Sequence, residues 1–197
     1  MRTKKTKKGF TLMELVIVLA ILGILLAIIV PSWGYFIRRS RERSANAKAK
    51  VVFNAAQTEV TRVSMKERPE LNVVNDPTAD SVKKNAALSN IYMGSGDFYF
   101  YWDGHNGAKV DINGSPVTAS AASNTSFANG VNNINNNGEG CYKIYVSNYN
   151  VQSVVYCDIE NGRYKGTYPK GMDELSSGLQ GVVRSTNVRN IDLTTIT

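Results

Sequence analysis

A carboxylate lies inside an apolar segment near the N-terminus. Glu14 is the only charged side chain between Phe10 and Val30, a stretch of 21 residues. A helix of that length reaches about 30 Å, the thickness of the hydrocarbon core of a bilayer. A carboxylate there costs about 2–3 kcal/mol or more unless it is protonated, paired or close to the interface. The sequence therefore leaves two interpretations: Glu14 reaches back to the headgroups, or it pairs with a positive charge.

The chain has two cysteines, which could form a disulfide bond. Cys141 and Cys157 lie at the outer ends of two alternating runs, 141–147 and 151–157, which flank a short Asn-Tyr-Asn turn. This pattern is typical of a β-hairpin. If Ser147 faces Val151, then Cys141 faces Cys157, and opposed residues lie within disulfide range. We predict a disulfide, with two reduced thiols as the alternative. The opposite side of the hairpin is predicted to face the core through Tyr142, Ile144, Val146, Val154 and Tyr156.

The remaining reactive side chains match no catalytic or metal-binding pattern. The single histidine, His105, lies in the turn-like sequence Asp-Gly-His-Asn-Gly, where we expect a surface position. No C-x-x-C, H-E-x-x-H, G-x-S-x-G or phosphate-binding loop motif is present. Asp111 to Ser115 alternates oxygen-bearing side chains but lacks the rest of a calcium loop. We therefore predict no enzymatic activity, no cofactor and no metal site.

The net charge of +7 comes mostly from the N-terminus. Residues 1–9 carry five basic side chains and no acid, and without them 18 basic residues face 16 acidic ones. A second basic cluster lies just beyond the apolar segment, so the charges on its two flanks do not decide its orientation. Bulk charge therefore argues little for nucleic-acid binding.

The junction between the basic run and the apolar segment is more specific. "KKGFTLMEL" places Gly9 after the lysines, Phe10 at the start of the apolar run and Glu14 four residues later. This order resembles the class III leader of type IV prepilins and pseudopilins, in its short type IVa-like form. The resemblance implies that a prepilin peptidase cleaves after Gly9 and methylates the new amine of Phe10. It also implies that Glu14 docks to the Phe10 amine of a neighbouring subunit.

The apolar segment is expected to begin a long helix. We expect residues 10–31 to form the membrane or filament-core part, and residues 32–67 an amphipathic continuation. Pro31 and Gly34 are predicted to kink the helix, because proline removes a backbone donor and clashes with the preceding turn. Arg68, which precedes Pro69, is predicted to end it. The apolar side chains that recur every three or four residues predict one buried stripe, formed by Ala45, Ala49, Val52, Ala56, Val60 and Val63.

Residues 68–197 are predicted to form an antiparallel β head. Residues 97–103 read as an aromatic strand, and "AKVDI" after the turn as a second strand. The Asn/Ser-rich segment 113–140 is expected to be an exposed loop. The last 17 residues read as a β-prone tail that either adds an edge strand or wraps a neighbour. The fold class expected is α+β, pilin-like, with an N-terminal helical spine packed on this sheet.

The resemblance implies a structural subunit of a type IV pilus that polymerises with copies of itself. Its implied partners are the prepilin peptidase, the assembly platform and ATPase, and the cytoplasmic or inner membrane before assembly. The leader would be cytoplasmic, the head outside, and the product an extracellular filament for adhesion, motility or DNA uptake. Two alternatives stay open: a pseudopilin of a type II secretion or competence machine, and a membrane-anchored binding protein that is never processed.

Overall fold

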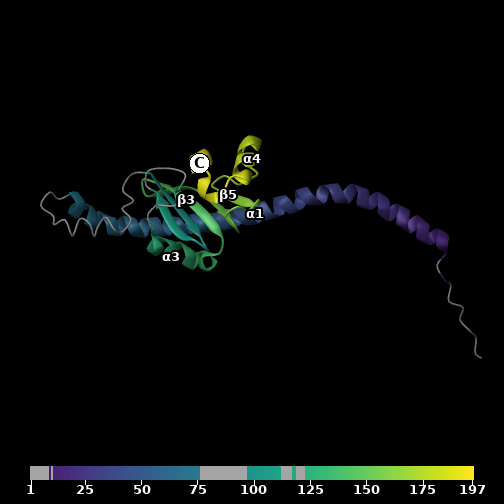
Figure 1. The fold of residues 1–197 in the computed structure, drawn as a ribbon, viewed down its shortest axis with the longest axis horizontal. Coiled ribbons are helices and arrows are strands. Elements are labelled where there is room, and N and C mark those ends of the chain that lie inside the picture. Colours follow the sequence, from purple (N-terminus) through teal and green to yellow (C-terminus); the bar gives the residue numbers. More distant parts are fainter. Residues whose placement is uncertain (1–8, 10, 76–96, 112–116, 119–122) are drawn as a thin grey trace, which may run out of the picture. The chain divides into compact units, whose positions relative to one another are not determined.

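The computed structural model describes residues 9, 11–75, 97–111, 117–118 and 123–197 (Figure 1). The chain divides into two units, residues 1–40 and residues 41–197. The start of the predicted head, residues 76–96, and parts of the predicted loop 113–140 lie outside the described residues.

The N-terminal element is one helix, α1, from Leu12 to Asn75. Pro31 and Gly34 both lie within the continuous helix, so the kink predicted at these residues stays a prediction. The end predicted before Pro69 is wrong, because α1 runs eight residues past position 67. A proline inside a helix removes one backbone hydrogen bond, and the residues on either side can still keep helical geometry.

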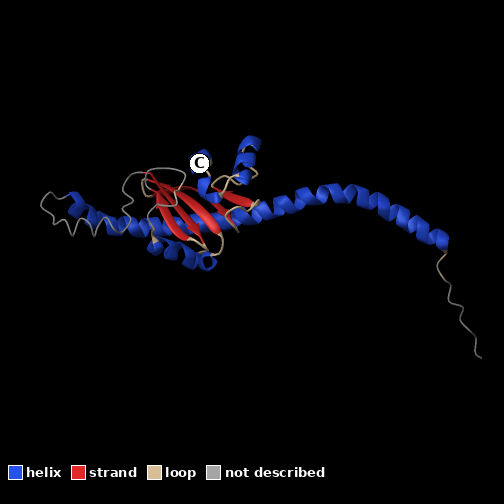
Figure 2. Ribbon diagram, viewed as in Figure 1, coloured by secondary structure: helices blue, strands red, loops and turns tan. Residues whose placement is uncertain are grey.

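The second unit contains an antiparallel sheet of five strands in the order β2-β1-β3-β4-β5 (Figure 2). The strands are β1 (Asp97–Asp103), β2 (Gly107–Asp111), β3 (Cys141–Ser147), β4 (Asn150–Cys157) and β5 (Lys165–Tyr168). The two strands expected in 97–112 are confirmed as β1 and β2. Together with α1 they confirm the α+β class, a helix packed on an antiparallel sheet.

One face of the sheet packs against α1. The predicted helix stripe is buried from Ala45 to Val60, and Val63 packs at its edge. These side chains share a core with the predicted inward-facing residues of the hairpin, Tyr142, Ile144, Val146, Val154 and Tyr156. Helical spacing of three and four on α1 and alternation along the strands thus meet in one apolar layer.

Residues 125–134, expected within the exposed loop, instead form helix α3 (Thr125–Ile134). The Asn124 side chain accepts a hydrogen bond from the Phe127 amide at 2.8 Å and caps the helix. Phe127 packs edge-on to Phe100 with ring centroids 4.8 Å apart. The Asn-rich composition obscured this helix, which a short apolar set and its N-cap specify. The short helix η1 (Asn136–Gly138) follows.

The C-terminal residues cover the other face of the sheet, so the predicted β-prone tail is wrong. They form α4 (Ser177–Ser185) and the short helices η2 (Val188–Asn190) and η3 (Leu193–Thr195). Figure 1 shows α3 and the C-terminus on opposite sides of the sheet. A second core lies under this layer and includes Tyr101, Val155, Val183, Ile191 and Leu193. Burial of these apolar side chains overrides their local preference for strand.

The predicted register of the hairpin is confirmed at the open end of the hairpin and is wrong near its turn. Cys141 pairs with Cys157, and pairing continues as predicted to Tyr145, which is followed by a β-bulge. Ser147 therefore pairs with Asn150, where Val151 was predicted. Asn148 and Tyr149 both have positive φ, 51° and 60°. That is the geometry of a two-residue type I′ turn, which suits strand twist better than the three-residue turn that was expected.

Candidate N-terminal assembly site

The start of α1 carries an apolar surface that the rest of the chain does not cover. Residues Leu12–Pro31 are long and apolar enough to cross a membrane, and none of them is buried. Large aliphatic side chains such as Leu12 and Ile28 are 81% and 69% exposed. Exposing these apolar side chains to water would be costly, so this segment needs a lipid or protein environment.

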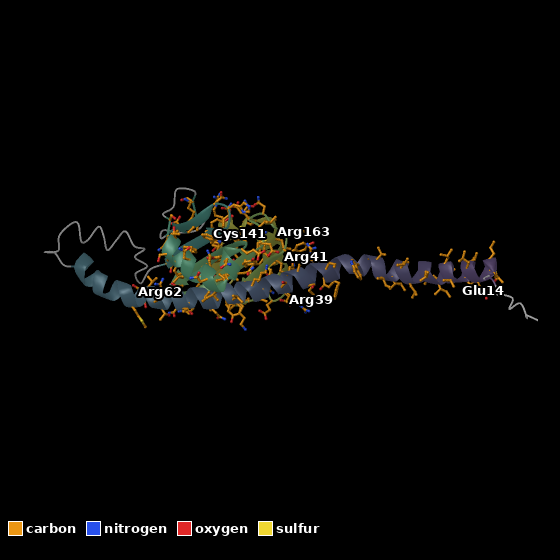
Figure 3. All side chains as sticks on the ribbon, turned by 90° about the horizontal axis from the view of Figure 1, so that it is seen from below. Glu14, Arg39, Arg41, Arg62, Cys141 and Arg163 are labelled. Carbon is orange, nitrogen blue, oxygen red and sulfur yellow. The ribbon has the colours of Figure 1, made fainter. Side chains whose placement is uncertain are left out.

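Glu14 makes its hydrogen bonds within the first turn of α1, at the end labelled in Figure 3. Glu14 Oε2 accepts from the Thr11 backbone amide at 2.8 Å and from the Thr11 hydroxyl at 2.9 Å. The Glu14 amide in turn donates to Thr11 Oγ1 at 3.3 Å. This reciprocal pattern is a capping box, in which two amides without helical partners are satisfied. Sequence reasoning missed it, although Thr-Leu-Met-Glu is its signature.

The other predicted N-terminal residues flank this turn. Gly9 is exposed and lies in non-helical backbone two residues before the capping threonine. Phe10, the predicted methylation site, lies outside the described residues. Cleavage after Gly9 and docking between Phe10 and Glu14 therefore stay predictions.

Two comparisons with known proteins are informative. A sequence model of the family described as "Prokaryotic N-terminal methylation motif" matches residues 4–30. A type IV major pilin protein, PilA of Myxococcus xanthus (strain DK1622), is 40% identical over 57 residues. The N-terminal region of this chain therefore resembles that of type IV pilins. The glycine-phenylalanine junction, Glu14 and the apolar helix are therefore parts of one motif.

The alignment with the Myxococcus pilin covers a short part of each protein. The aligned residues cover 29% of this chain and 26% of the Myxococcus pilin. No solved structure matches the chain. The family model covers residues 4–30 and does not extend into the head.

The head of this pilin-like chain is fixed to α1 by polar contacts that the sequence did not reveal. The Arg184 guanidinium donates to both oxygens of Glu42, Nε to Oε1 at 2.6 Å and Nη2 to Oε2 at 3.0 Å. Asn46 Oδ1 accepts from the amides of Thr167 and Met172 at 3.0 and 3.3 Å. These partners are more than 120 residues apart in sequence. No local pattern could have paired them.

The two cysteines lie opposite one another on the face covered by the C-terminal layer. Both are buried, and both are free thiols in this structure, so the predicted disulfide is not formed here. The Cys157 thiol donates to the Tyr164 carbonyl at 3.2 Å. Burial, reinforced by the neighbouring Asp103, raises the pKa of Cys141 to about 12. A thiol held protonated is a poor nucleophile, so oxidation of the pair stays a prediction.

Two buried lysines bind the C-terminal layer to the sheet. Lys143 Nζ donates to the Ile191 carbonyl at 2.7 Å, and Lys165 Nζ donates to the Gly162 and Arg184 carbonyls at 2.6 and 3.0 Å. Burial lowers the pKa of Lys143 to about 8, although Asp192 and Asp111 act against the shift. In the described residues, no group of three or more His, Cys, Asp or Glu side chains is placed to hold a metal ion.

Proposed function

We propose that this chain is a structural subunit of a type IV pilus. The observation that carries the proposal is the Gly9–Phe10 junction followed by Glu14 and an uncovered apolar helix, because a soluble protein has no use for that surface. The motif match to residues 4–30 and the similarity to a major pilin support it.

In the proposed assembly, a prepilin peptidase cleaves after Gly9 and the Phe10 amine is methylated. Subunits wait in the cytoplasmic or inner membrane with the head outside. An assembly ATPase and platform protein then extract them, and burial of the apolar helices against one another drives polymerisation. Glu14 pairs with the Phe10 amine of a neighbour. A buried ion pair adds little net stability, but leaving either charge unpaired costs several kcal/mol. The pair therefore sets the axial register between subunits.

The second candidate is a pseudopilin of a secretion or competence machine, since its leader and first helix would be the same. An unprocessed membrane-anchored binding protein is the third. Adhesion, motility or DNA uptake by the filament would depend on exposed loops of the head.

The test is the intact mass and the N-terminal peptide mass of the protein from its native cell. We expect a chain that begins at N-methylated Phe10 and lacks two hydrogens, from a disulfide between Cys141 and Cys157. A mature chain that retains Met1–Gly9 would overturn the filament proposal, whereas a processed chain with both thiols reduced would overturn the disulfide alone. Electron microscopy of filaments that contain this chain separates a pilin from a pseudopilin.

A further inference from the structure

Three exposed aromatic residues follow the end of the apolar segment. The candidate span ends at Pro31, and Trp33, Tyr35 and Phe36 are 60%, 57% and 66% exposed. Residues two and three positions apart on a helix point about 200° and 300° around its axis, so these rings surround the helix. Tyrosine and tryptophan favour the headgroup layer of a bilayer, which contacts a helix from all sides.

Two arginines lie close to the central tyrosine of this group. The Arg38 guanidinium carbon lies 5.4 Å from the centre of the Tyr35 ring, and Arg39 Nη1 donates to the Tyr35 hydroxyl at 3.4 Å. Both arginines thus reach back by three or four residues toward the N-terminal side, as helical side chains tend to do. Their charges are held near the level of Tyr35 rather than farther along the helix.

In a bilayer spanned by residues 12–31, that level would lie in the headgroup layer. Tyr35 follows Pro31 by four residues, which is about 6 Å along the helix, and the headgroup layer extends about 5–7 Å beyond the hydrocarbon core. Arginine binds phosphate through several donors of a planar guanidinium. Lysine and arginine clusters beside a membrane span are attracted to anionic lipids by about 1 kcal/mol per residue.

We propose that Tyr35, Arg38 and Arg39, here called the collar, bind the phosphates of anionic phospholipids around the helix while the subunit is in the membrane. The inference rests on the proposed function, since it needs residues 12–31 to span a bilayer. The distribution of aromatic residues around the helix favours lipid over a protein partner, which would contact one side. The alternative occupant is a second copy, whose head has a cavity of about 640 Å³ lined by acidic residues that include Glu139 and Glu160.

The test uses the full mature chain with Trp102→Phe, which leaves Trp33 as the single tryptophan. The protein is reconstituted in mixed vesicles of phosphatidylcholine and phosphatidylglycerol, in which one lipid or the other carries brominated chains that quench tryptophan. We expect phosphatidylglycerol to quench Trp33 at least about twofold more strongly per molecule, because each collar arginine attracts anionic lipid. The preference should weaken as salt is raised.

Charge-matched variants identify the residues responsible. Arg38→Gln with Arg39→Gln should abolish the preference, while Arg163→Gln with Lys109→Gln removes the same charge from the head and should leave it intact. Equal quenching by the two lipids in the parent chain, or an equal loss in both double variants, would overturn the collar. Equal quenching together with self-association that depends on Arg38 and Arg39 would assign them instead to a second copy.

The outcomes also separate this inference from the proposed function. Quenching of Trp33 without lipid preference places the segment in the bilayer and overturns the collar alone. If neither lipid quenches Trp33, the segment is not at a membrane interface and both proposals fail.

Discussion

At the residue scale, Glu14 caps the first turn of α1, and we propose that it also docks a neighbouring subunit. In the single chain its carboxylate accepts two hydrogen bonds from Thr11 and completes a capping box. In the proposed filament it also pairs with the Phe10 amine of a neighbour. Capping needs only an acceptor at this position, whereas pairing with an amine needs a negative charge.

Substitutions at these two positions separate capping from docking. Glu14→Gln retains a capping side chain but removes the charge, so we expect normal cleavage and at least a hundredfold fewer filaments, since an unpaired buried charge costs about 3–5 kcal/mol. Thr11→Ala removes a cap worth about 1 kcal/mol and should lower the filament number by a few-fold at most. Filaments are counted by electron microscopy and cleavage is measured by mass spectrometry. Normal filaments from Glu14→Gln would show that docking does not need the charge.

At the element scale, the contact between α1 and β5 is close enough to require a glycine. A Cβ built on Gly166 would lie 2.0 Å from the carbonyl carbon of Ala45 and 2.2 Å from the Asn46 amide nitrogen. Both neighbours are backbone atoms of α1, which cannot move aside as a flexible side chain would. Small residues on α1 and Gly166 on β5 therefore let the helix approach the edge of the sheet.

A pair of glycine substitutions tests this packing. Gly166→Ala should destabilise the head by about 3 kcal/mol, the upper part of the range for overpacked cores. Gly178→Ala in α4 is the matched control, because a Cβ there meets nothing within 4 Å. The control should be neutral or more stable by up to about 1 kcal/mol, as alanine favours helix. Denaturant unfolding of the full chain in detergent measures both, and equal stability of the two variants would contradict the close contact.

At the scale of the whole head, the sheet is buried on both faces. α1 and α3 cover one face, and the segment from α4 to the C-terminus covers the other. The second face carries buried polar side chains that each donate at least one hydrogen bond to a backbone carbonyl of the C-terminal layer. Besides the two lysines, the Ser153 hydroxyl donates to the Leu193 carbonyl at 2.8 Å. The C-terminal residues therefore belong to the folded head.

Lys143 makes the stability of this layer depend on pH. The pKa of Lys143 is about 8 in the folded state and near 10.4 in the unfolded state. Between these two values the unfolded state binds more protons, so the free energy of unfolding rises with pH there. Buried cysteines and tyrosines with raised pKa values oppose this trend, so the native chain is compared with Lys143→Met. We expect the stability of the native chain relative to the variant to rise by about 1 kcal/mol between about pH 7.5 and 9. An unchanged difference in unfolding free energy would show that Lys143 is not held in a desolvated site.

The N-terminal region and the central hairpin were predictable because their signals are local in sequence. The order of Gly9, Phe10 and Glu14 before an apolar run predicts the leader and the span, and alternation around a short turn places Cys141 opposite Cys157. Local composition failed where burial decides the structure. The asparagines of α3 made its sequence resemble a loop, so the helix was not predicted. The C-terminal residues form short helices because their apolar side chains cover the second face of the sheet.

The sequence by itself determined the membrane-length helix, the N-terminal methylation motif and the antiparallel hairpin. Only the tertiary structure decided that Glu42 binds Arg184, that Asn46 binds the backbone after Gly166, and that the C-terminus covers buried lysines. The reason is physical. Apolar runs and turn residues act on their neighbours in the chain, whereas these three contacts exist only when folding brings together residues 48 to 142 positions apart.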